Sequence, residues 1–131
     1  MSQENVEVVR ASFAPWNAGE MDAYQDLYDP HAVLRTLEGW PEPGPYYGRE
    51  AVMRELGRMR SAWATDSAEV ISDFIDVGDR VAVRFILRGV GHSPGVAQEM
   101  TALFTVRKGK SLALEAFWDH AEALGFLGLE E

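Results

Sequence analysis

The sequence contains no cysteine in its 131 residues. This absence excludes disulfide bonds, thiolate metal sites and a cysteine nucleophile. Its apolar runs are far shorter than the roughly 20 residues that a membrane span requires. The first residues, MSQENVEVVR, also lack the basic start and apolar segment of a secretory signal. We therefore expect no membrane association and a cytoplasmic location.

Basic residues are scarce. The chain has 12 of them against 21 acidic residues, which gives a formal net charge of −9. Such a surface repels phosphate backbones, so no nucleic-acid partner is expected. A local exception is a group of arginines on one predicted helix, which we interpret as a solvated face pairing with Glu50 and Glu55. This group comprises Arg49, Arg54, Arg58 and Arg60.

The usual motifs of metal, phosphate and nucleophile sites are also missing. The histidines are scattered at His31, His92 and His120, without HxH or HExxH spacing. No glycine-rich loop follows a strand and opens a helix, and no serine stands in a nucleophile elbow. The sequence therefore predicts neither a metal site nor a bound cofactor.

The overall composition is that of a globular protein. Hydrophobic residues make up 47% and charged residues 25%, as in an ordinary folded domain, and the length suits a single domain over residues 1–131. Apolar residues recur at helical spacing over residues 4–17, 22–28 and 49–63. Pro15 and Gly19 should end the first helix, and Asp22 should cap the second.

Strand patterns dominate the rest of the chain. They cover residues 31–37, 68–77, 80–89, 96–107 and 111–119, and a short helix is expected in the tail. Three helices followed by consecutive strands predict an α+β fold, with the helices packed on an antiparallel sheet. The alternation of one strand places four apolar side chains on the face toward the helices, namely Val81, Val83, Phe85 and Leu87.

The last strand is apolar on both faces. One face carries Leu112, Leu114, Ala116 and Trp118, and the other carries Ala113, Glu115 and Phe117. A sheet that is apolar on both faces needs cover on both. The helices can cover one face, and we expect a second copy of the chain to cover the outer one, which predicts a homodimer.

The order of these segments, together with several local motifs, resembles the NTF2-like superfamily and in particular its SnoaL-like members. The motifs are WNAGEMDAYQDLYDPHAVLRT, GPYYGREAV, GDRVAVRF, FTVRKGKSLALEAFWDHAEAL and the ending LGL. The resemblance implies a cone, in which a strongly curved sheet wraps round, the helices close one side and the open end admits a ligand. Members of the superfamily include isomerases, cyclases, epoxide hydrolases, dehydratases and binding modules, so the resemblance indicates a fold rather than an activity.

In such a cone, the proline-rich stretch 38–47 lies at the mouth. Its prolines fix φ and hold the large rings of the segment in place. We expect a pocket for a small apolar molecule, such as a polyketide, terpenoid or steroid fragment, with one or two hydrogen-bonding groups. Its residues would be Trp16, Thr36, Trp40, Tyr46, Tyr47, Phe85, Ala102 and Trp118.

The resemblance also allows the known chemistries to be tested position by position. A ketosteroid-isomerase-like site would place its tyrosine at Ser12, its base at Thr36 and its second acid at Ala102, or at Thr101 with a different gap. A limonene-epoxide-hydrolase-like site would place its charged residues at Phe85, Leu87 and Ala116. None of these residues can perform the required step, so both mechanisms are expected to be absent.

Cyclase-like members of the family use one acidic residue as a proton shuttle. Glu99 and Glu115 point away from the interior by strand parity, which leaves Asp119 and His120 as catalytic candidates. Asp119 can equally cap the tail helix. Three hypotheses remain open: a domain that binds a small apolar ligand, an isomerase, cyclase or lyase with a non-standard acid-base site, and a dimerisation domain whose cone is plugged.

Overall fold

The computed structural model describes residues 2–36, 44–62, 67–88, 97–126 and 128. The elements in chain order are α1 (Ser2–Arg10), α2 (Phe13–Ala18), α3 (Met21–Gln25), β1 (Tyr28–Arg35), β2 (Tyr46–Tyr47), α4 (Arg49–Ala62), β3 (Ser67–Val70), β4 (Ile75–Val77), β5 (Arg80–Arg88), β6 (Ala97–Arg107), β7 (Lys110–Phe117) and α5 (His120–Phe126). The fold is α+β, as the sequence predicts.

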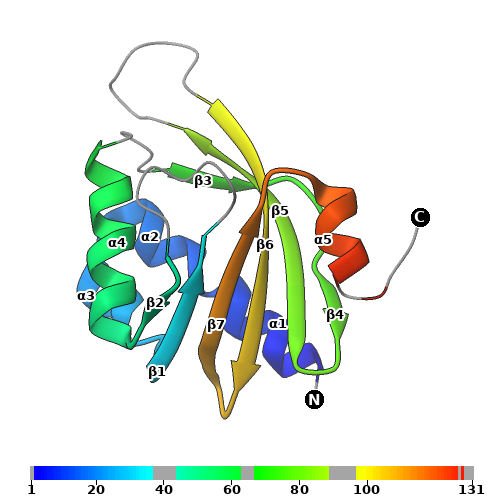
Figure 1. Cartoon of the computed structure of the whole chain (residues 1–131), viewed down its shortest axis with the longest axis horizontal. Helices are drawn as coiled ribbons and strands as arrows, with labels where there is room; N and C mark the ends of the chain where they lie inside the picture. The colour runs from blue at the N-terminus through cyan, green and yellow to red at the C-terminus, as the bar shows by residue number, and fades with distance from the viewer. Residues whose placement is uncertain (1, 37–43, 63–66, 89–96, 127, 129–131) are drawn as a thin grey trace.

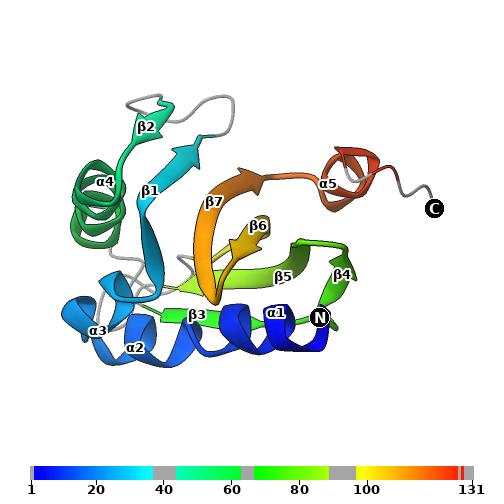
Figure 2. The same ribbon diagram turned by 90° about the horizontal axis from the view of Figure 1, so that it is seen from below.

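The strands form one curved sheet in the order β2-β1-β7-β6-β5-β3, and β4 pairs with β5. Neighbouring strands are antiparallel except β1 and β7, which are parallel, so the sheet is mixed rather than purely antiparallel. Figure 2 shows the sheet bending from β3 and β5 up through β7 to β1, with α1, α2 and α3 below it and α4 beside β1. The bend leaves one concave face, and the core lies against it.

The register of the central strands determines which side chains enter this core. Val83 is opposite Ala102, which is opposite Ala116 on β7. Directly paired residues project to the same face of a sheet. The predicted inward set of Val81, Val83, Phe85 and Leu87 is confirmed: all four belong to, or pack against, the core cluster that includes Val6 and Val9 of α1.

The first helix breaks where one continuous helix was predicted. Pro15 lacks a backbone N–H, and its ring conflicts with the carbonyl four residues earlier, that of Ala11. The chain turns at Ala11 and Ser12 and restarts as α2. At the break, the Val9 carbonyl oxygen accepts hydrogen bonds from the Ser12 hydroxyl at 2.6 Å and from the Ser12 N–H at 3.0 Å.

Two other boundaries differ from the prediction. The second helix stops at Gln25, its N-cap position is Glu20 rather than Asp22, and Tyr28 already belongs to β1. Pro30 lies inside β1 at an irregularity of register between Tyr28 and Val33, where a missing ladder bond is tolerated. The strand predicted over 68–77 is divided into β3 and β4.

The outer face of the sheet is partly covered by α5, which lies on the side opposite α1 (Figure 2). Leu103 and Ala82 project to this face, and each is 0% exposed. Ala123 and Leu124 of α5 are buried as well, and α5 contacts β5, β6 and β7. Helix α5 thus covers part of the outer face that a second copy of the chain was expected to cover. The homodimer stays a prediction, and it now concerns only the remainder of this face.

None of the helices in the described part of the chain combines the length and the apolar character needed to cross a bilayer.

Candidate functional site

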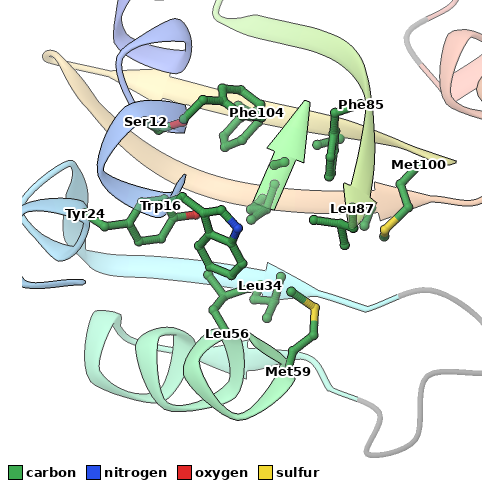
Figure 3. Close-up of a pocket in the computed structure, with 15 residues that line it drawn as sticks. Ser12, Trp16, Tyr24, Leu34, Leu56, Met59, Phe85, Leu87, Met100 and Phe104 are labelled. Carbon is green, nitrogen blue, oxygen red and sulfur yellow. The ribbon is translucent and has the colours of Figure 1, made fainter. Parts of the chain in front are cut away.

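The concave side of the sheet encloses a cavity between the helices and the central strands. Its volume is about 70 Å³, counted as space open to the centre of a water molecule. One water needs only about 10–15 Å³ by this measure, so the space exceeds that of a chance packing defect. Figure 3 shows side chains from α2, α4 and the strands converging on it. The lining residues are Ser12, Phe13, Trp16, Tyr24, Leu34, Leu56, Met59, Ala68, Phe85, Leu87, Met100, Ala102, Phe104, Leu114 and Ala116.

Trp16 is the largest side chain in the wall, and the surrounding structure fixes its position. Helix α2 ends at Gly19 with φ 76°, a left-handed conformation that suits glycine. Arg60 of α4 then reaches the end of α2: its Nη2 donates to the Trp16 carbonyl oxygen at 2.9 Å, and its guanidinium carbon lies 5.5 Å from the centre of the indole ring. On α2 itself, Asn17 exchanges two hydrogen bonds with the Ala68 backbone, at 2.6 and 3.1 Å.

The indole nitrogen of Trp16 has no hydrogen-bond partner among the described residues, although the side chain is only 5% exposed. Figure 3 shows this nitrogen pointing into the space enclosed by the labelled side chains. A buried donor without an acceptor costs about 1–3 kcal/mol, and native interiors contain few of them. The cavity therefore contains one strong, unused hydrogen-bond donor.

Tyr24 supplies a second polar atom to the wall. Its ring lies 5.3 Å from that of Trp16, and its hydroxyl is 2.7 Å from that of Tyr28. Burial raises the pKa of Tyr24 to about 12, and the hydrogen bond from Tyr28 offsets part of that rise. Burial also raises the pKa of Tyr28 well above its ordinary value, helped by the charge of a nearby Tyr24 phenolate and by the hydrogen bond to Tyr24. Either hydroxyl can donate to the other across this contact, and when Tyr28 donates, the proton of Tyr24 is left for another acceptor.

This tyrosine pair predicts a loss of stability at high pH. The folded pKa of Tyr24 is about 12 against 10.0 for an ordinary tyrosine, so its contribution is complete below pH 10 and is lost as the pH rises toward 12. Between pH 8 and 11, the free energy of unfolding of the wild type should fall by about 1 kcal/mol per tyrosine more than that of a Tyr24→Phe/Tyr28→Phe variant. Urea unfolding at both values measures the difference. Equal losses in the two proteins would contradict the burial of these hydroxyls.

The third polar side chain of the wall is Ser12, whose proton is already used. Its hydroxyl donates to the Val9 carbonyl, so toward the cavity it can only accept. Among the wall residues that the structure describes, none is Asp, Glu, His, Lys or Arg. The cavity thus offers two neutral donors, one acceptor and otherwise apolar surface.

A family model described as the SnoaL-like domain matches residues 9–113. The chain belongs to the SnoaL-like domain family.

Three solved structures share its fold. Bal32a, from a soil-derived mobile gene cassette, is 23% identical with a TM-score of 0.71, and the match covers 88% of each chain. A candidate polyketide cyclase from Sinorhizobium meliloti is 25% identical with a TM-score of 0.69, covering 84% of this chain and 93% of that one. TerC, co-crystallized with polyporic acid, is 18% identical with a TM-score of 0.70, covering 95% and 98%. A comparison with curated protein sequences finds no match.

The positions where the resemblance would place catalytic groups can now be located in this SnoaL-like domain. Ser12, Phe85, Leu87, Ala102 and Ala116 all line the cavity. The five positions therefore border one cavity, and none of them carries an ionisable side chain. Thr36 is elsewhere: its Oγ1 accepts a hydrogen bond from the Gly44 N–H at 2.8 Å and borders a shallow surface hollow.

Three of the predicted pocket residues lie in the wall, namely Trp16, Phe85 and Ala102. Tyr46 packs against the core without lining the cavity, and Tyr47 is 67% exposed. The pairing of β2 with β1 explains this difference, because Tyr46 is opposite the inward-facing Leu34 and the next residue must face away.

Two further predicted pocket residues are not in the described wall. Trp118 is 41% exposed, because β7 ends at Phe117 and the alternation that places Leu114 and Ala116 inside stops there. Trp40 lies outside the described residues.

The two catalytic candidates lie on the side of the sheet opposite the cavity. Oδ1 of Asp119 accepts a hydrogen bond from the Ala121 N–H at 2.9 Å, so this carboxylate caps α5. Nδ1 of His120 is 3.0 Å from the hydroxyl of Thr101, whose neighbour Ala102 faces the cavity. Both candidates thus lie at the start of α5, on the outer face of the sheet and away from the cavity.

The other acidic candidates also point outward, as predicted. Glu99 forms an ion pair with Arg84, and Glu115 lies 3.9 Å from Arg35. Neither glutamate is part of the cavity wall.

The arginine-rich face of α4 is only partly the solvated face that was predicted. Arg54 pairs with Glu50 at 3.6 Å in solvent, and Arg58 makes two hydrogen bonds to Glu55, at 2.7 and 2.9 Å. Glu55, however, is buried. Arg49 donates to the Tyr28 carbonyl oxygen at 3.2 Å, as Arg60 does to that of Trp16, so two of the four arginines tie α4 to the elements that carry the site.

Several wall residues were not identified from the sequence, namely Tyr24, Leu56, Met59, Ala68 and Met100. Leu56 and Met59 lie in the predicted apolar stripe of the third helix, so periodicity marked them as buried without showing that they border a space. The spacing of four residues between Tyr24 and Tyr28 suggested a helical pair, but Tyr28 lies in β1, so helical spacing does not explain their contact. Nothing in the sequence distinguishes Ala68 or Met100 from core residues.

Proposed function

We propose that this SnoaL-like domain binds a small apolar molecule in the cavity between α2, α4 and the curved sheet. The observation that carries the proposal is the cavity itself, walled by aromatic and aliphatic side chains with a few polar atoms. Such a composition is typical of small-molecule sites, where apolar walls supply affinity and isolated polar groups supply orientation. Ring-shaped polyketide, terpenoid or steroid fragments fit this description, and the described relatives include a candidate polyketide cyclase.

Binding is favoured over acid-base catalysis because of the wall chemistry. Proton transfer requires a group whose pKa is near the working pH, placed within hydrogen-bond reach of the substrate. The described wall offers Trp16, Ser12 and a neutral tyrosine with a pKa of about 12. The predicted homodimer and cytoplasmic location are compatible with this role and stay predictions.

A thermal-shift series tests the proposal. Neutral one- and two-ring compounds should raise the melting temperature, since a ligand that binds only the folded state stabilises it by about 2.7 kcal/mol at 100 times its Kd. Native mass spectrometry of the purified protein should show the same compounds bound at one per chain. If the whole series leaves the melting temperature unchanged, the proposal is wrong and the space is only a void in the core.

A further inference from the structure

The unused indole N–H of Trp16 specifies what the ligand must carry. The Trp16 side chain is 5% exposed, and Nε1 has no acceptor among the described residues. The centre of its ring lies 5.3 Å from that of Tyr24 and 5.5 Å from the guanidinium carbon of Arg60, and Arg60 also donates to the Trp16 carbonyl oxygen. The donor is therefore fixed in direction before any ligand arrives. An apolar ligand would leave it unsatisfied, whereas a ligand with an acceptor would satisfy it.

Tyr24 provides a second donor on the same wall. The hydroxyls of Tyr24 and Tyr28 share a hydrogen bond of 2.7 Å in which either can donate, and Tyr28 itself is not part of the wall. With Tyr28 as the donor, the hydroxyl proton of Tyr24 is available to a group inside the cavity. Figure 3 shows the hydroxyl end of Tyr24 beside the indole of Trp16. Both donors therefore serve the same part of the cavity, beside α2.

The charge of the ligand follows from the rest of the wall. Transferring an ionised carboxylate into an apolar site is very unfavourable unless a cation or several donors compensate it. The described lining residues include no Lys, Arg or His. A cationic ligand would equally lack a carboxylate partner there. A neutral acceptor such as a ketone, quinone or lactone carbonyl meets two donors without this cost.

We propose that the ligand is a neutral ring compound with a carbonyl-type acceptor, and that the Trp16 Nε1–H is the specificity-determining donor that binds this oxygen. The inference rests on the proposed function, since it concerns the same cavity. It adds that hydrocarbons and carboxylates of the same shape bind more weakly than the carbonyl compound.

Three compounds of one shape test this inference: 1-indanone, its hydrocarbon indane, and indane-1-carboxylate. Calorimetric titration of the wild type should give a Kd for 1-indanone that is about 10-fold lower than the Kd for indane. This ratio corresponds to the free energy gained when one buried donor is satisfied. The carboxylate should bind at least about 10-fold more weakly than 1-indanone, because it loses hydration without a cationic partner.

The variant Trp16→Phe keeps an aromatic ring in the wall but removes the N–H. It should bind indane within about 3-fold of the wild type, while the ratio between 1-indanone and indane falls from about 10 to about 3 or less. Tyr24→Phe serves as a second variant and should lower the same ratio by a smaller factor, because Trp16 would still donate. Infrared difference spectra give a readout that does not depend on the folding of either variant. The carbonyl stretch of 1-indanone bound to the wild type should lie below its value in hexane.

The outcomes separate the two proposals. If neither neutral compound binds the wild type, the proposed function is wrong and this inference with it. Equal affinities for 1-indanone and indane would leave ligand binding supported and overturn the role of the Trp16 donor. Preferred binding of the carboxylate, or an unshifted carbonyl stretch, would also overturn it. A 10-fold preference that Trp16→Phe removes is the expected result.

Discussion

Replacing Ala102 with leucine is expected to abolish binding of 1-indanone while leaving the fold intact. Ala102 is buried on β6, faces the cavity and lies between Val83 and Ala116 in the sheet register. A leucine side chain there would project into the empty volume that a ligand needs. We expect the Kd for 1-indanone to rise by 100-fold or more. The melting temperature should stay the same or rise, since filling a cavity commonly adds about 0.5–2 kcal/mol of stability.

The matched control for this variant is Ala113→Leu. Ala113 is half-buried on β7 but projects to the opposite face of the sheet, as the alternation with Leu114 requires. Its binding of 1-indanone should remain within about 3-fold of the wild type. Titration calorimetry and thermal unfolding of both variants provide the two readouts. Undiminished binding by Ala102→Leu would show that the compound binds elsewhere on the protein.

The second large effect is a loss of folding stability when the side chain of Leu103, on the outer face of the sheet, is truncated. This side chain is 0% exposed although it points away from the cavity, and α5, whose Ala123 and Leu124 are buried, contacts β6 on that face. Leu103→Ala should lower the free energy of unfolding by about 2–5 kcal/mol, the range for deleting a buried leucine side chain. Denaturant unfolding measures this loss. Hydrogen exchange at the Ala123 N–H, which bonds to the Asp119 carbonyl oxygen in α5, should become faster.

Glu99→Ala is the control on the same face of β6. Glu99 is exposed and pairs with Arg84, and surface ion pairs contribute only about 0–1 kcal/mol. A loss at Leu103 no larger than that at Glu99 would mean that α5 does not form part of the core. The difference between the two variants therefore measures how much of the outer face is covered within one chain.

The sequence was sufficient for the fold and for part of the site. Strand alternation predicted which face of β5 is buried, and the Asn-Ala-Gly turn supported the resemblance that the family match confirms. The structure gives that turn a physical basis: the Asn17 side chain bonds to β3, and Gly19 adopts the left-handed conformation that ends α2. Strand alternation and the left-handed glycine are local rules that depend on neighbouring residues alone, whereas the bond from Asn17 to β3 is a long-range contact.

The remaining features depend on contacts that no local pattern encodes. Pro15 was expected to end a helix, but its ring acts one turn earlier and breaks the helix at Ser12. Trp118 has the right parity for the interior, yet the strand ends before it. The unpaired Trp16 nitrogen is the clearest case of a feature that the sequence cannot show. It depends on the folded arrangement, in which no acceptor among the described residues lies within reach of the N–H.

The parallel pairing of β1 with β7 also affects how the polypeptide folds during its synthesis. Leu34 is paired with Leu114, so an early strand of the described sheet pairs with one that is synthesised after all of its other strands. Contacts between residues so distant along the chain carry a large entropic cost of closure and slow the folding reaction. A nascent chain that still lacks β7 therefore exposes the edge of β1. The sheet becomes continuous from β1 to β6 only after β7 has been synthesised.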